Sequence, residues 1–139
     1  MVLVDTSVWV DYFRGRETIE TFYLSDLIAE NADICISGIV LTEILQGIPN
    51  EEEYKRVNAS LDALIFLPVL KPDYVTAAEI YRQARSRGQV IRNTIDCLIA
   101  VCAMTHNVPL LQNDKDYLAI AKVSKLRLIE LDKLEGLTR

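Results

Sequence analysis

A ten-residue apolar stretch interrupted by a single acid constrains the fold of this chain most. Between residues 95 and 104 every residue is apolar except Asp96. A helix that is apolar on all sides is a buried helix, so the sequence predicts a central buried helix with one carboxylate in its first turn. A short strand-like run follows at residues 108–111, and it ends at an acidic turn that contains Asp114 and Asp116.

Two further acids are placed in a similar way. Asp5 comes directly after the apolar run of residues 2–4, and Glu43 lies on the apolar side of a predicted helix. Parallel strands joined by helices end at the edge of the sheet where the following helices begin. Ligand sites of open α/β sheets lie at that edge. We therefore expect a set of acids at one edge of the sheet: Asp5, Glu43, Asp96, Asp114 and, as a fifth nearby, Asp116.

The order of the elements predicts an α/β fold. We expect strands at residues 1–4, 33–36, 65–70, 108–111 and 125–131, with helices between them and a tail at residues 134–139. The expected architecture is a three-layer sandwich, a mostly parallel sheet of about five strands flanked by helices. Half of the 139 residues are apolar and no linker or repeat interrupts them, so we expect a single domain over residues 1–139.

The composition argues against several kinds of site. The sole histidine, His106, falls near a helix end and rules out a multi-histidine zinc site. Cys35, Cys97 and Cys102 lie in apolar surroundings without a CxxC pair, so we expect buried thiols. No apolar run approaches the roughly 20 residues of a membrane span, and residues 2–4 are too short for a signal-peptide core. We expect a soluble cytoplasmic protein.

The charge is unevenly distributed along the chain. The net charge is −5, but residues 71–92 carry +3, which leaves −8 for the remainder. A local basic segment on an acidic body fits a protein that grips nucleic acid at one place. Arg85, Arg87 and Arg92, just ahead of Asp96, are therefore candidates for contacts with a phosphate backbone, although a solvated helix face and loop explains them equally well.

The converging acids point to a metal-dependent reaction. Four carboxylates on one edge would repel one another and raise their own pKa values, and a hard divalent cation removes that repulsion. An all-oxygen ligand set favours Mg²⁺ or Mn²⁺, as one or two ions. Such a site suits phosphodiester hydrolysis, because a bound ion activates water and neutralises charge on the phosphate. No histidine base is needed.

Each acid also has a simpler structural interpretation. Asp5 fits a helix cap, Asp96 fits a favourable charge in the first turn of a helix, and Asp114 with Asp116 fits an ordinary turn. Glu43 is the hardest to explain in this way, because an acid on an apolar helix face is costly unless it is paired or binds a metal. The joint arrangement is more informative than any single acid.

Four segments together resemble the PIN-domain ribonucleases, and most closely the VapC-type toxins of toxin–antitoxin pairs. They are VLVDTSVWVDYFRG, SGIVLTEILQG, IRNTIDCLIAVCA and LLQNDKDY, and the resemblance covers the whole length. It implies that Asp5, Glu43, Asp96 and Asp114 are catalytic and, with Asp116, bind the metal, supported by Thr6, Ser7 and Asn113. One departure is Gln112, because the family often carries Thr or Ser there, and this affects the supporting hydrogen bonds at that corner.

The resemblance also implies partners. Such proteins use Mg²⁺ or Mn²⁺, cut RNA, usually form homodimers and are held inactive by a cognate VapB-type antitoxin. We expect the C-terminal segment of the antitoxin to present Arg or Lys to the carboxylates and to bury an apolar anchor. Trp9, Phe13 and Phe22 are candidates for that apolar groove, although core packing also accounts for them.

Two other classes of protein remain open at this stage. One is a non-cleaving RNA- or protein-interaction domain of the PIN fold, which would have no use for four facing carboxylates. The other is a phosphoacceptor signalling domain, which would carry adjacent acids after its first strand, whereas Asp5 is followed by Thr6 and Ser7. Incubation with Mn²⁺ and structured RNA distinguishes the first class, and an acyl-phosphate donor tests the second.

Overall fold

Short parallel strands form the centre of the protein. The computed structural model describes residues 1–131, and within them the strands β1 (Val2–Val4), β2 (Ile34–Ser37), β3 (Ile65–Leu67) and β4 (Leu110–Leu111) form one sheet in the order β3-β2-β1-β4. Every pairing is parallel. The residues of β1, β2 and β4 are all buried, which explains why these strands are continuously apolar.

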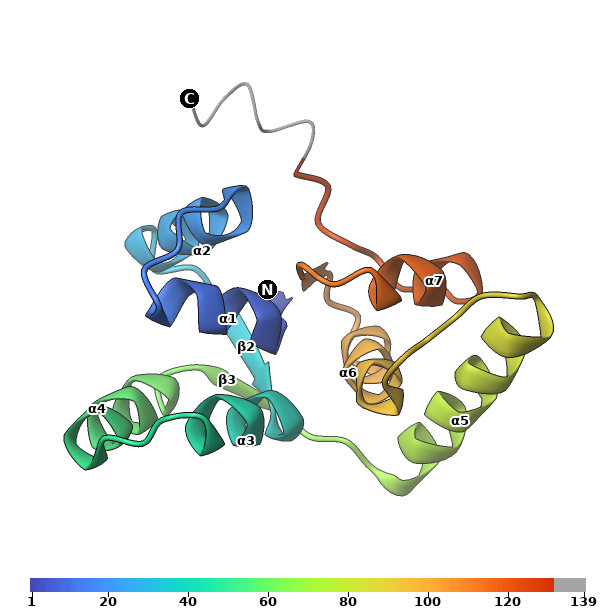
Figure 1. Cartoon of the computed structure of the whole chain (residues 1–139), viewed down its shortest axis with the longest axis horizontal. Helices are drawn as coiled ribbons and strands as arrows, with labels where there is room; N and C mark the ends of the chain where they lie inside the picture. The colour runs from blue at the N-terminus through green and yellow to red at the C-terminus, as the bar shows by residue number, and fades with distance from the viewer. Residues whose placement is uncertain (132–139) are drawn as a thin grey trace.

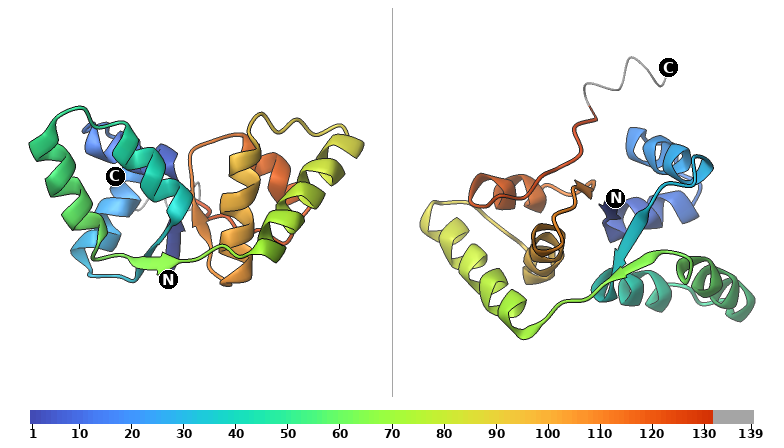
Figure 2. Two further views of the ribbon diagram at one scale, coloured as in Figure 1. Left: turned by 90° about the horizontal axis from the view of Figure 1, so that it is seen from below. Right: turned by 180° about the vertical axis from the view of Figure 1, so that it is seen from behind.

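Helices flank this sheet in two groups, as Figures 1 and 2 show. One group comprises α1 (Thr6–Phe13), α2 (Ile19–Ala29), α3 (Gly38–Gln46) and α4 (Glu51–Leu61). The other comprises α5 (Lys71–Ser86), α6 (Thr94–Thr105) and α7 (Asp116–Lys122). The predicted α/β architecture with a parallel sheet flanked by helices is therefore confirmed.

Side-chain caps fix where several of these helices begin. Ser37 accepts a hydrogen bond from the backbone N–H of Val40, and Asn93 accepts one from that of Ile95. Such caps satisfy the backbone donors that a helix leaves free in its first turn. The cap at Asn93 places Asp96 in the first turn of α6, next to the end of β1.

The buried helix predicted from the apolar stretch is α6. Its residues Cys97, Ile99, Ala100, Val101, Cys102 and Ala103 are at most 2% exposed. All three cysteines are free and buried, as expected, and burial raises the pKa of Cys97 and of Cys102 to about 11. His106 follows the C-terminal end of α6 with its Nε2 atom 2.9 Å from the carbonyl oxygen of Pro68. None of the helices among residues 1–131 is long and apolar enough to span a membrane.

The number of strands was predicted wrongly, because residues 1–131 contain four rather than about five. Residues 125–131 contribute only an isolated parallel bridge between Leu128 and Leu110. Leu110 donates its backbone N–H to the carbonyl oxygen of Arg127 and accepts the backbone N–H of Ile129, but its strand β4 is only two residues long, so the ladder does not extend. The expected tail at residues 134–139 lies outside the described residues.

Two other strands are shorter than predicted because proline interrupts them. Strand β3 ends at Leu67, directly before Pro68, and β4 begins at Leu110, directly after Pro109. Proline has no backbone N–H to donate to a sheet ladder. Strand β4 ends at Leu111 as predicted, next to the end of β1, because Asp5 donates its backbone N–H to the carbonyl oxygen of Leu111 at 2.9 Å. The acidic turn that follows β4 therefore lies close to Asp5.

Candidate active site

All five predicted acids line one pocket at the carboxyl-terminal edge of the sheet. The pocket has a volume of about 360 Å³ and is lined by Asp5, Thr6, Ser7, Glu43, Arg92, Asn93, Asp96, Asp114 and Asp116. These residues come from the end of β1, from α1 and α3, from the start of α6 and from the loop between β4 and α7. The rule that parallel strands end where the following helices begin therefore predicted correctly that these acids lie at one edge of the sheet.

Asp5 is both a helix cap and a member of the pocket. Its Oδ2 atom accepts hydrogen bonds from the backbone N–H of Ser7 at 3.0 Å and from the Ser7 hydroxyl at 2.6 Å. Its Oδ1 atom accepts a hydrogen bond from the hydroxyl of Tyr117 at 2.6 Å. The carboxylate is only 4% exposed, so these donors hold it in one orientation.

Glu43 reaches the pocket from α3. The hydroxyl of Thr6 donates to its Oε1 atom at 2.8 Å, which links the start of α1 to α3. The side chain is half-buried, beside the fully buried Val40. Glu43 was predicted on the apolar side of its helix, and in the structure it lines the pocket. Its carboxylate has a hydrogen-bond partner there, which lowers the cost of burying it.

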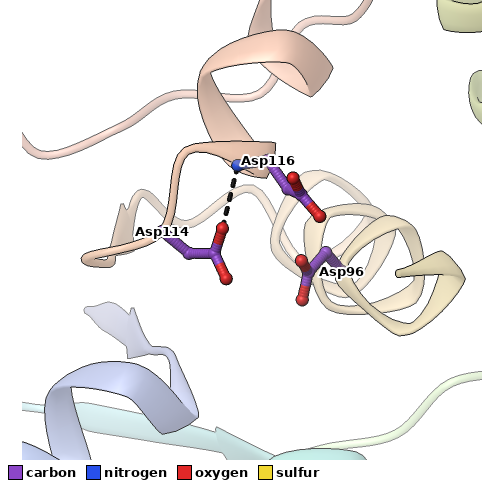
Figure 3. Close-up of side chains that lie close together, drawn as sticks. All are labelled: Asp96, Asp114 and Asp116. Carbon is purple, nitrogen blue, oxygen red and sulfur yellow. Dashed lines mark hydrogen bonds between the residues drawn. The ribbon is translucent and has the colours of Figure 1, made fainter. Parts of the chain in front are cut away.

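Asp96, Asp114 and Asp116 form the tightest part of the site. Each offers one carboxylate oxygen that lies within 4.8 Å of the other two, and Figure 3 shows the three side chains facing a common space. Asp114 is also anchored locally, because its Oδ1 atom accepts the backbone N–H of Asp116 at 2.9 Å. Asp5 and Glu43 lie in the same pocket but outside this group of three.

The burial of Asp96 and the neighbouring acids strongly shift the pKa of its carboxyl group. Burial, followed by the charges of Asp5 and Asp114, raises the pKa of the Asp96 carboxyl to about 8. The group is 9% exposed and therefore holds a proton at neutral pH when no cation compensates the surrounding charge. A strongly shifted carboxyl in a polar pocket is typical of functional sites.

Arg92 supplies the positive charge of the pocket. Its guanidinium donates from Nε to Oδ1 of Asp116 at 3.1 Å and from Nη2 to Oδ1 of Asp114 at 2.9 Å. Its backbone N–H also donates to Oδ2 of Asp116 at 2.9 Å. Burial alone would raise the pKa of Asp116, but the hydrogen bonds from Arg92 hold it below the usual value.

The other two candidate arginines lie outside the pocket. Arg85 projects from α5 with its guanidinium 5.5 Å from the ring centroid of Tyr81, and Arg87 forms the C-cap of the same helix. The structure thus separates Arg92, which pairs with the acids, from Arg85 and Arg87, which are exposed on the neighbouring helix end.

The supporting hydrogen bonds come partly from main-chain atoms. Asn113 donates its backbone N–H to the hydroxyl of Ser7 at 3.1 Å, so it contributes through the main chain. Gln112 accepts the backbone N–H of Asp114 on Oε1 at 2.6 Å. A glutamine at this position therefore caps the acidic turn, which resolves the departure noted in the sequence.

Sequence reasoning missed Tyr117. It is fully buried, and its hydroxyl lies 2.6 Å from Oδ1 of Asp5 and 3.4 Å from Oδ1 of Asp96. Burial and the neighbouring carboxylates raise its pKa well above the usual value, so the phenol keeps its proton. A tyrosine directly after Asp116, at the start of an otherwise apolar short helix, was the only signal in the sequence.

Comparisons with known proteins define the family. The PIN domain family matches residues 2–123. The chain is 34% identical over 129 residues to Ribonuclease VapC11 of Mycobacterium tuberculosis, covering 91% of this chain and 96% of that protein. It is 29% identical to Ribonuclease VapC1 of Methanocaldococcus jannaschii, covering 93% and 87% of the two chains. The chain therefore belongs to the PIN domain family.

Solved structures show the same fold. VapBC2 from Rickettsia felis, bound to a promoter DNA fragment, contains a chain with a TM-score of 0.71 and 23% identity, covering 93% of this chain and 98% of that one. FitAcB from Neisseria gonorrhoeae gives a TM-score of 0.71 and 22% identity, covering 94% and 98%. The resemblance that the four sequence segments indicated is confirmed at the level of the family and the fold.

Proposed function

We propose that this protein is a metal-dependent endoribonuclease and the toxin of a VapBC toxin–antitoxin pair. The observation that carries the proposal is the convergence of Asp96, Asp114 and Asp116 within 4.8 Å, in one pocket with Asp5 and Glu43. The ribonuclease names of relatives that match almost the whole chain support the same activity.

The residues of the pocket fit a hard divalent cation. All the candidate ligands are carboxylate oxygens, the donor set that Mg²⁺ and Mn²⁺ prefer. Asp5, Glu43, Asp96 and Asp114 are the proposed ligands of one or two ions, with Asp116 as a fifth. The raised pKa of Asp96, which burial and the charges of Asp5 and Asp114 cause, supports this assignment, because a bound cation would compensate those charges. When bound, such an ion supplies an activated water and charge neutralisation at the phosphate.

The chain's own residues prepare the site for this chemistry. Ser7 and Tyr117 orient Asp5, Thr6 orients Glu43, and Gln112 fixes the turn that carries Asp114. Arg92 holds Asp116 from the rim of the pocket. These contacts restrict the carboxylates to few orientations, which lowers the conformational cost of assembling a ligand set.

Cleavage of structured RNA by the purified chain tests the proposal. We expect product formation in Mn²⁺ or Mg²⁺ buffer and none after the ion is removed with a chelator, with recovery when excess Mn²⁺ is added. The cleaved ends are mapped on total cellular RNA to identify the target. Cleavage that persists at full rate in chelator would contradict a metal-dependent mechanism.

Arg85, Arg87 and Arg92 remain the proposed contacts with the RNA backbone: the first two are exposed at the end of α5, and Arg92 is exposed beside the pocket, where it pairs with Asp114 and Asp116. Neutralising a phosphate releases condensed counterions, so removal of such a contact lowers the salt dependence of binding. RNA affinity measured over a range of salt concentrations should therefore show a shallower slope for Arg85→Ala. An unchanged slope would assign Arg85 to an ordinary solvated helix face.

An apolar cavity beside α1 fits the proposed antitoxin anchor. It has a volume of about 450 Å³ and its lining includes Trp9, Tyr12, Phe13, Ile28, Leu61 and Leu64. Trp9 is 3% exposed and packs in the core, so Tyr12 and Phe13 are the α1 side chains that contribute most exposed surface to this cavity. Phe22 is exposed on α2 but does not line this cavity. A homodimer of the chain is also part of the proposal.

Competition between the antitoxin and the metal tests this partner. We expect the C-terminal peptide of the antitoxin encoded beside this chain's gene to bind more weakly at saturating Mn²⁺, because its cationic side chain and the ion would use the same carboxylates. Asp5→Asn should weaken the peptide in metal-free buffer. A peptide that binds equally well in all these conditions inhibits from another surface.

A further inference from the structure

One fully buried hydroxyl joins two of the proposed metal ligands. Tyr117 lies in the first turn of α7 and is 0% exposed. Its hydroxyl donates to Oδ1 of Asp5 at 2.6 Å and lies 3.4 Å from Oδ1 of Asp96. Asp5 directly follows β1, and Asp96 lies in the first turn of α6. The hydroxyl oxygen of Tyr117 therefore connects these two elements on the core side of the pocket.

The ring of Tyr117 does not need this hydroxyl for packing. Phenylalanine would fill the same apolar space, and a buried phenol is tolerated only when it has a hydrogen-bond partner. Here the acceptor at 2.6 Å is the Asp5 carboxylate, and a hydrogen bond to a charged acceptor is about twice as strong as one between neutral groups. The hydroxyl is therefore directed at the acids rather than accommodated by chance.

The hydrogen bonds of Asp5 leave it able to bind an ion. A carboxylate has about four acceptor positions. Ser7 occupies Oδ2 with two donors, and Tyr117 occupies Oδ1 with one. Acceptor capacity therefore remains on Oδ1, the oxygen that Tyr117 fixes. The placement of that oxygen relative to Asp96 depends on the shared hydroxyl, because among residues 1–131 no other side chain is hydrogen-bonded to both acids.

We propose that Tyr117 is a positioning residue for the metal site, which fixes Oδ1 of Asp5 relative to Oδ1 of Asp96 through its buried hydroxyl. This inference rests on the proposed function. Tyr117 itself touches neither the substrate nor the ion, because its side chain is sealed in the core. Partners that orient metal ligands in this way typically change metal affinity by about 10- to 100-fold when they are removed.

The test is the substitution Tyr117→Phe, which removes one oxygen atom and keeps the ring. We expect the dissociation constant for Mn²⁺, measured by calorimetry on the intact chain without RNA, to rise by about 10- to 100-fold. Cleavage should fall at low Mn²⁺ and recover towards the wild-type rate when Mn²⁺ saturates the variant. That recovery separates a positioning role from a catalytic one. The matched control is Tyr23→Phe, which removes a hydroxyl from a half-buried ring on α2 outside the pocket.

Thermal unfolding gives a second measurement that does not depend on activity. An ion that binds only the folded chain raises the unfolding midpoint more when it binds more tightly, so the increase caused by a given Mn²⁺ concentration should be smaller for Tyr117→Phe than for wild type or Tyr23→Phe. Equal increases, or equal Mn²⁺ dissociation constants, overturn the role of Tyr117 while leaving the nuclease proposal intact. A wild-type chain that binds no Mn²⁺ overturns both.

Discussion

The Asp96→Asn variant should lose Mn²⁺ binding, and its rate of RNA cleavage should fall at least a thousandfold, while it keeps its fold. Asp96 belongs to the group of three acids within 4.8 Å, and an amide oxygen without charge is a much weaker ligand for a hard cation than a carboxylate. A catalytic ion supplies several kcal/mol of transition-state stabilisation, and about 4 kcal/mol corresponds to a factor of roughly a thousand in rate.

The comparison is made on total cellular RNA in Mg²⁺ or Mn²⁺ buffer, with Mn²⁺ affinity measured in parallel. The control is Asp26→Asn, an equal change of charge at an exposed position on α2, which should cleave like the wild type. Robust cleavage by Asp96→Asn in the same buffer would remove Asp96 from the proposed metal site, and with it the strongest support for this mechanism.

The same substitution should stabilise the metal-free protein, and increasingly so as the pH rises. In the folded protein the pKa of Asp96 is raised from 3.8 to about 8. Below pH 4 the carboxyl is protonated in both the folded and the unfolded chain and costs nothing. Between pH 4 and 8 only the folded chain keeps the proton, so the free energy of unfolding of the wild type falls as the pH rises. Above pH 8 Asp96 is ionised in both the folded and the unfolded chain, and the wild type carries the full destabilisation from the buried charge.

Asparagine has no proton to lose, so the advantage of Asp96→Asn should grow from near zero at pH 4 to on the order of 5 kcal/mol at pH 8. The measurement is denaturant unfolding of both proteins in chelator, at intervals across this range. Titrating groups outside the pocket are shared and cancel in the difference, and Asp26→Asn should follow the wild type. Stability curves of wild type and Asp96→Asn that stay parallel from pH 4 to 8 would show that Asp96 is not held protonated. Added Mn²⁺ should reverse the order of stability, because it stabilises only the chain that binds it.

The sequence by itself determined the features that depend on short-range patterns. The apolar stretch around Asp96 became the buried helix α6. Ser37, directly before α3, caps that helix, and Asn93, directly before α6, caps α6. Caps and helix faces involve residues only a few positions apart, so a short segment of sequence determines them. The rule that parallel strands end where the next helices begin then placed Asp5 and Asp114 in one pocket.

Only the tertiary structure decided which polar atoms meet across the pocket. Tyr117 contacts Asp5 across 112 positions of the chain, and Arg92 pairs with Asp114 and Asp116 across more than 20. An apolar pattern predicts that a residue is buried, but it does not say where the polar tip of a buried tyrosine points. The same limit explains residues 125–131, which have the composition of a strand but form a single bridge, because their partner strand β4 is only two residues long. Pairing of distant groups depends on the packed arrangement of whole elements, and that information is not contained in any one segment.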